Sequence, residues 1–86
     1  MNAMIEDLRK KIAQTLEASD VAKLVAEIEL ESDLNEFGDE FLRVIVKLKP
    51  TEMNIETALE AALEQIEDAV APLDDRYPSV RFLDAA

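Results

Sequence analysis

The segment ESDLNEFGDE at residues 31–40 gathers five carboxylates within ten residues and could bind a divalent cation or exchange protons with a substrate. The acidic residues are Glu31, Asp33, Glu36, Asp39 and Glu40. Hard cations such as Ca²⁺ are bound by carboxylate and carbonyl oxygens, and paired carboxylates can act as general acid and base. This segment, the acidic loop, is therefore the first candidate for a chemical site.

An EF-hand calcium loop requires oxygen ligands at its first, third, fifth and twelfth positions and a glycine at its sixth. Counted from Asp33, the first, third and sixth positions match with Asp33, Asn35 and Gly38, but the fifth is Phe37 and the twelfth is Val44. The bidentate carboxylate is missing, and the flanking segments have the pattern of strands instead of helices. We interpret the loop as the solvated tip of a β-hairpin, with Gly38 supplying a positive φ angle. The alternative is a small divalent-ion-binding protein or a carboxylate-based enzyme that uses this loop.

The sequence contains no cysteine and no histidine. It therefore has no disulfide framework, no thiolate zinc site, no cysteine nucleophile and no histidine to serve as general base. Glycine-rich phosphate-binding loops and the nucleophile-elbow motif are also missing from the sequence. We predict a protein that is not an enzyme, with no catalytic residue, no metal ligand and no cofactor.

The formal net charge is −11, and the segment from Pro50 to Asp75 holds eight acidic residues but neither lysine nor arginine. Proteins bind nucleic acids and anionic membranes through clustered lysine and arginine. We therefore expect no direct binding of nucleic acid and no binding to membranes. No apolar run approaches the ~18 residues that span a bilayer, and we expect a cytoplasmic protein.

Within this acidic segment, Glu56, Glu60, Glu64 and Asp68 follow one another at intervals of four residues. On a helix this spacing places them in one column, where like charges repel their neighbours. The column is either a surface that keeps the protein soluble or a docking surface for a basic protein partner. We favour a non-catalytic protein–protein interaction module, and the chain could also be a subunit whose activity lies in another protein.

The elements that position these residues follow from the spacing of the apolar side chains. Residues 4–18 and 55–71 repeat apolar residues at helical intervals, whereas residues 22–31, 41–49 and 79–83 alternate apolar and polar residues as strands do. The two central strands carry opposite charge on their polar sides, with Glu27, Glu29 and Glu31 on one and Arg43, Lys47 and Lys49 on the other. An antiparallel hairpin would place these acids opposite these bases.

We therefore predict a single α+β domain over residues 1–86, in the order α-β-β-α-β. Two layers are expected, with both helices on one face of a three-stranded mixed sheet. The opposite face would then be open, with Val25, Phe41 and Ile45 among its charged residues. Because an exposed apolar sheet face gains stability when it is covered, we expect a homodimer that uses these three residues.

The α-β-β-α-β order resembles that of the cytosolic domains of cation diffusion facilitator transporters and of prokaryotic-type KH domains. The metal-binding histidines of the first family and the GxxG loop and basic surface of the second are absent here, as is the CxxC of iron–sulfur scaffold proteins with similar order. The chain is also similar to small, uncharacterised bacterial proteins that share an LRVxV strand, here Leu42–Val46, and a VRF strand, here Val80–Phe82. These resemblances imply a fold and no activity.

Overall fold

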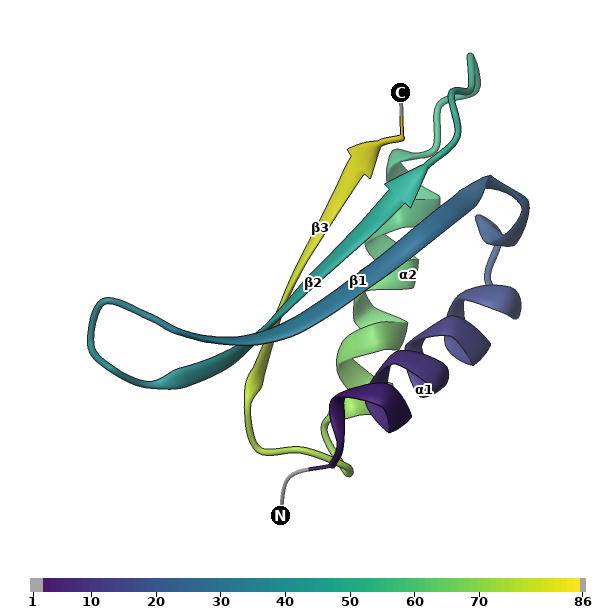
Figure 1. Ribbon diagram of the computed structural model, residues 1–86. Helices are drawn as coiled ribbons and strands as arrows, with labels where there is room; N and C mark the ends of the chain where they lie inside the picture. Colours follow the sequence, from purple (N-terminus) through teal and green to yellow (C-terminus); the bar gives the residue numbers. More distant parts are fainter. Residues whose placement is uncertain (1–2, 86) are drawn as a thin grey trace.

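A computed structural model describes residues 3–85 of the chain (Figure 1). The elements are, in order, α1 (Ile5–Glu17), the short 3-10 helix η1 (Ala22–Leu24), β1 (Val25–Leu34), β2 (Glu40–Leu48), α2 (Glu56–Val70) and β3 (Tyr77–Asp84). Both α-helices lie on the same side of one three-stranded sheet (Figure 1). The predicted single α+β domain with α-β-β-α-β order and a mixed sheet is confirmed.

The central strand of the sheet is β2, in the order β1-β2-β3. It pairs antiparallel with β1, as the predicted hairpin, and parallel with β3, which α2 connects to it as a crossover. The hairpin register places Glu27 opposite Lys47 and Glu31 opposite Arg43. The expectation that acids face bases across the hairpin is therefore met for Glu27 and Glu31, whereas Glu29 pairs with Ile45 and Lys49 lies beyond the end of β2.

The core lies between the helices and one face of β2. The four side chains that β2 directs toward the helices are at most 5% exposed: Leu42, Val44, Val46 and Leu48. The helices bury one stripe each against them, and Val21 joins the core from the turn after α1. The buried helix residues are Leu8, Ile12 and Leu16 from α1 and Ala62, Ile66 and Val70 from α2. Their helical spacing is the reason that the charged residues of both helices point outward.

The beginning of β1 differs from its prediction, because the strand contains an irregularity between Val25 and Glu27. Val25 pairs with the buried Leu48 and packs against the core on the helix side. A β-bulge inserts one extra residue, here Ala26, and so reverses the face to which the side chains before it point. The prediction that Val25 lies on the open face is therefore wrong.

The middle of the acidic loop, residues 35–39, is a tight turn closed by the Asn35 side chain, while its first four residues belong to β1, which runs three residues past its predicted end, and Glu40 belongs to β2. The Asn35 Oδ1 atom accepts hydrogen bonds from the backbone N–H groups of Phe37, at 2.9 Å, and Asp39, at 3.0 Å. Gly38 has a φ angle of 83°, a conformation that costs residues other than glycine free energy. The interpretation of this segment as a hairpin tip with a positive-φ glycine is confirmed.

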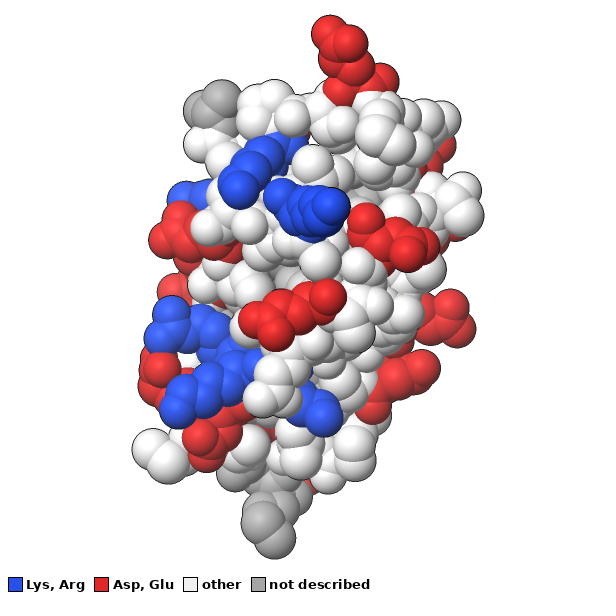
Figure 2. Space-filling model, turned by 90° about the vertical axis from the view of Figure 1, so that its right-hand side faces the viewer, with Lys and Arg blue, Asp and Glu red and all other residues white. Residues whose placement is uncertain are grey.

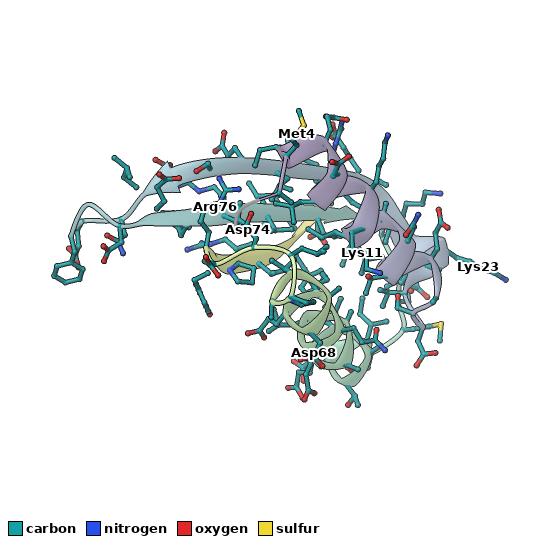
Figure 3. All side chains as sticks on the ribbon, turned by 90° about the horizontal axis from the view of Figure 1, so that it is seen from below. Met4, Lys11, Lys23, Asp68, Asp74 and Arg76 are labelled. Carbon is teal, nitrogen blue, oxygen red and sulfur yellow. The ribbon has the colours of Figure 1, made fainter. Side chains whose placement is uncertain are left out.

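A buried ion pair, which we call the Asp74–Arg76 clamp, joins the α2–β3 turn to the start of the chain. Asp74 is 4% exposed, and its carboxylate accepts hydrogen bonds from Arg76 Nε at 2.9 Å, Arg76 Nη2 at 2.7 Å and the Ala3 backbone N–H at 3.1 Å. Arg76 Nη2 in turn donates to the Ala3 carbonyl oxygen at 3.3 Å, and Arg76 Nη1 lies 3.8 Å from a Glu40 oxygen. Figure 3 shows Asp74 and Arg76 side by side. The clamp therefore fixes the segment that precedes α1.

The side-chain hydrogen bonds from Arg76 lower the pKa of Asp74 from 3.8 to about 2, although burial acts in the opposite direction. A carboxyl group with a lower pKa in the folded than in the unfolded chain stabilises the fold only while it is ionised. The contribution of the clamp is thus complete above about pH 4 and is lost as the pH falls toward about 2.

Replacing Asp74 by Asn removes this charge while the amide keeps the shape of the side chain. We expect the free energy of unfolding at neutral pH to fall by about 1–2 kcal/mol, and the difference from the parent to shrink below about pH 4. Urea denaturation followed by circular dichroism, at neutral pH and again below about pH 4, measures the free energy of unfolding of the variant and the parent. The variant Asp20→Asn, at an exposed turn position, is the control and should match the parent. A loss for Asp74→Asn of equal size at both pH values would contradict the role of the charge.

Candidate functional site

The four acids singled out in the sequence all lie on α2. The Asn54 Oδ1 atom accepts a hydrogen bond from the Glu56 backbone N–H at 3.1 Å, and this bond satisfies a free donor at the beginning of the helix. From there the helix runs to Val70, with Ala62 and Ile66 buried against the core. The opposite side of the helix is left to the acidic residues.

The acidic column consists of Glu56, Glu60, Glu64 and Asp68, and all four are exposed. With Glu67 and no lysine or arginine, α2 carries five negative charges. No ion pair among residues 3–85 involves the column. Figure 3 shows Asp68 on the outer side of α2, away from the strands. The column is therefore a row of carboxylates without cations beside them.

A shallow depression continues this surface past the end of the helix. It is lined by Glu67, Asp68, Ala71, Asp74, Asp75, Arg76, Tyr77 and Pro78. The one cation among them, Arg76, has its guanidinium group bound by Asp74 in the clamp, which raises the pKa of Arg76. The depression therefore extends the negative surface without neutralising it.

The other acidic strip of the molecule, on β1, has its cations beside it. Arg43 lies 3.1 Å from Glu31 and 2.8 Å from Asp33, and Lys47 lies 3.4 Å from Glu27. Figure 2 shows lysines and arginines mixed with acids in its left and central part, and acids without them along its right edge. Uncompensated negative charge is thus a property of α2, and this distinguishes α2 from β1.

The acidic loop uses its oxygens within the fold. Asp33 accepts a hydrogen bond from the Leu34 N–H at 2.8 Å and contacts Arg43, while Glu40 accepts one from the Ser32 hydroxyl at 3.3 Å. Among the described residues, no group of three or more acidic side chains is arranged to hold a metal ion.

No helix within residues 3–85 is long and apolar enough to cross a membrane.

The structure brings together the four acids of the predicted docking surface and separates the three residues of the predicted dimer interface. Phe41 and Ile45 alternate with the buried residues of β2 and face away from the helices, whereas Val25 lies on the helix side. The Asp74–Arg76 clamp was not predicted from the sequence. The pair of an acid and an arginine two residues apart in a helix-ending turn was the available signal.

Comparison with known proteins shows the fold and no activity. No protein-family model and no curated protein sequence matches the chain. A solved structure of the MamM C-terminal domain in its copper form, a cytosolic domain of a cation diffusion facilitator, is similar with a TM-score of 0.50. The similarity covers 95% of this chain and 89% of that one at 16% sequence identity. The topological resemblance seen in the sequence is thereby confirmed at the level of the fold.

The repulsion within the acidic column should be measurable in the isolated protein. Glu64 lies about one helical turn from Glu60, Glu67 and Asp68, so Glu64→Gln removes three unfavourable contacts and should stabilise the protein by a few tenths of a kcal/mol per contact. Thermal denaturation should show the gain at about 0.01 M salt and little gain at about 1 M, where charges are screened within ~3 Å. Glu52→Gln, outside α2, is the control and should have a smaller effect. A destabilised Glu64→Gln variant would show instead that Glu64 makes a favourable contact.

Proposed function

We propose that the protein is a non-catalytic protein–protein interaction module that binds a basic partner through the acidic column of α2. The observation that carries the proposal is the row of four exposed carboxylates without an ion pair among the described residues. Neighbouring carboxylates raise the free energy of the unbound protein, and cations of a partner would remove this repulsion on binding.

The geometry of the column defines the chemistry of the partner. Residues four apart on a helix are separated by about 6 Å along its axis, so the column from Glu56 to Asp68 is about 18 Å long. A partner helix with lysine or arginine at every fourth position has the same spacing, and an extended chain with these residues at alternate positions has a spacing of about 7 Å. The partner in this proposal is therefore a protein segment rich in lysine and arginine.

The core supports this use of α2, because the buried side of the helix fixes the orientation of the acids. Ala62, Ile66 and Val70 are fully buried, so the helix is held against β2 and α1 before any partner arrives. A preformed surface loses little conformational freedom on binding. A negative surface also attracts a basic partner over distances up to the Debye length, about 8 Å at physiological salt.

The metal named with the MamM domain belongs to that protein, and our proposal includes no metal. The ligands that copper prefers are imidazole and thiolate groups, and this chain has neither histidine nor cysteine. The proposal places the module in the cytoplasm, a compartment with which the cysteine-free sequence is compatible.

Binding of a synthetic helical peptide with lysine at every fourth position tests the proposal, measured by fluorescence anisotropy against salt concentration. The variant Glu60→Gln/Glu64→Gln/Asp68→Asn should bind this peptide about tenfold more weakly or worse at low salt. The matched control Asp7→Asn/Glu17→Gln/Asp20→Asn removes the same charge from exposed positions on or near α1, and should bind nearly as well as the parent. Equal losses in the two variants would show that only net charge matters and would overturn the docking surface.

A further inference from the structure

The sheet has a second surface that α1 and α2 leave uncovered, which we call the open face. Its side chains alternate along the strands with those directed at the helices. The open face consists of Glu27, Glu29, Glu31 and Asp33 from β1, Phe41, Arg43, Ile45 and Lys47 from β2, and Tyr77, Ser79, Arg81 and Leu83 from β3. One edge of this surface is therefore acidic, and the opposite edge is not.

We propose that the open face binds the open face of a second copy of this chain, with a two-fold axis that runs parallel to β2. In this arrangement Ile45 meets Ile45 of the partner subunit on the axis. Arg81 lies across from Glu29 of the partner subunit, and the same pair repeats on the other side of the axis. The proposed dimer uses a different surface from the acidic column, so a negative result for one leaves the other untouched.

Apolar side chains give this face a reason to be covered. Tyr77 is 66% exposed and Leu83 is 46% exposed, and Phe41 and Ile45 are partly exposed between them. Phe41 and Tyr77 are neighbours in the sheet register. Removing such apolar surface from water contributes about 25 cal/mol per Å². Two sheets that pack face to face in this way lie about 10 Å apart, with their strands within about 30° of parallel.

The charges decide between the two symmetric ways of stacking the face on itself. With an axis in the plane of the face but perpendicular to the strands, β1 would lie over β1 of the second copy, and the four acids of one copy would face the same four acids of the other. With the axis parallel to the strands, β1 lies over β3 of the second copy. Under the parallel axis no acid of β1 faces another acid, but Arg43 and Lys47 of β2 face their own copies across the axis, each already paired with acids of β1. Because like charges buried against one another are unfavourable, the parallel axis, which has fewer such contacts, is favoured.

One row of the sheet register supplies the contacts of this arrangement. Glu29 and Arg81 are both register partners of Ile45, one on each side of β2. A two-fold axis through Ile45 and parallel to β2 places this row over the same row of the second copy in the opposite order. Each Arg81 therefore lies over Glu29 of the partner subunit. An arginine and a glutamate side chain together can bridge the ~10 Å between two packed sheets.

Among the cations of this face, Arg81 alone forms no ion pair with any residue that the structure describes. Arg43 and Lys47 are bound to the acids of β1, at distances from 2.8 to 3.7 Å. Within residues 3–85, no ion pair involves Arg81, which is exposed. Its charge is therefore available to a second copy, and Glu29, 3.7 Å from Lys47, keeps acceptor capacity for it.

Pairing of strand edges is the competing mode of self-association. The β1 edge would bring the acids Glu27, Glu29 and Glu31 of two copies close together, which disfavours it. The β3 edge has no such charge pattern and is the alternative that an experiment must distinguish. The open face measures about 26 Å by about 14 Å, small beside the ~800 Å² per partner of a standard interface, so the proposed dimer is weak.

Sedimentation equilibrium of the full chain over a range of concentrations tests the proposal, at about 0.15 M salt. We expect a monomer–dimer equilibrium with a dissociation constant of about 10–100 µM. The variant Arg81→Glu should weaken the dimer at least about tenfold, because it faces Glu29 of the partner subunit twice. The double variant Arg81→Glu/Glu29→Lys should recover the parent value within about threefold.

Lys10→Glu changes the net charge by the same amount on α1, and this control should leave the dissociation constant near that of the parent. Circular dichroism establishes that each variant is folded. A parent chain that stays monomeric up to about 1 mM would overturn the proposal. So would an Arg81→Glu dimer as tight as the parent, which would point to the β3 edge, or a double variant that stays as weak as Arg81→Glu.

Discussion

The packing of one side of β2 against both helices is the interaction on which the rest of the structure depends. Among the strand residues of the described chain, 3–85, only Leu42, Val44, Val46 and Leu48 are fully or almost fully buried, and they contribute to a core shared with both helices. A chain of 86 residues buries a modest fraction of its surface, so it has no second core to replace this one. The orientation of α2, and with it the direction of its acids, follows from this contact.

Side chains of β2 alternate between the helix side and the open face, and the molecule therefore has two outward surfaces on opposite sides. Residues of β2 that point away from the helices form the middle of the open face, while the helix residues that point away from β2 include the acidic column. The two surfaces differ in their charge balance: the acids of β1 have Arg43 and Lys47 beside them, whereas those of α2 form no ion pair within residues 3–85. A basic protein and a second copy of the chain could therefore bind at the same time, without competing for one site.

The parts of the structure that could be predicted from sequence are those fixed by contacts close along the chain. The hairpin was predictable because the alternation of apolar residues and the opposite charges on the two strands both indicate an antiparallel pair. The acidic column was predictable because residues four apart lie on one side of a helix. The bulge at Ala26 was hidden, since Leu24, Val25 and Ala26 are all apolar and give no sign of which face each one takes. The Asp74–Arg76 clamp was missed because its third member, Ala3, lies 71 residues away from Asp74. Strand order was also not predictable, because it depends on which edge of the hairpin β3 pairs with after α2, and the spacing of apolar residues carries no information on that.

The mixed sheet also implies an order of assembly. In the antiparallel half, Leu34 pairs with Glu40 across a short turn, so the two strands need little loop closure to find each other. In the parallel half, Phe41 pairs with Tyr77, and the whole of α2 lies between them. Non-local pairings of this kind form slowly, because chain entropy is lost before the contacts can compensate for it. We therefore expect β3, the yellow strand of Figure 1, to pair last during folding. Until β3 is synthesised, one edge of β2 would be unpaired and exposed.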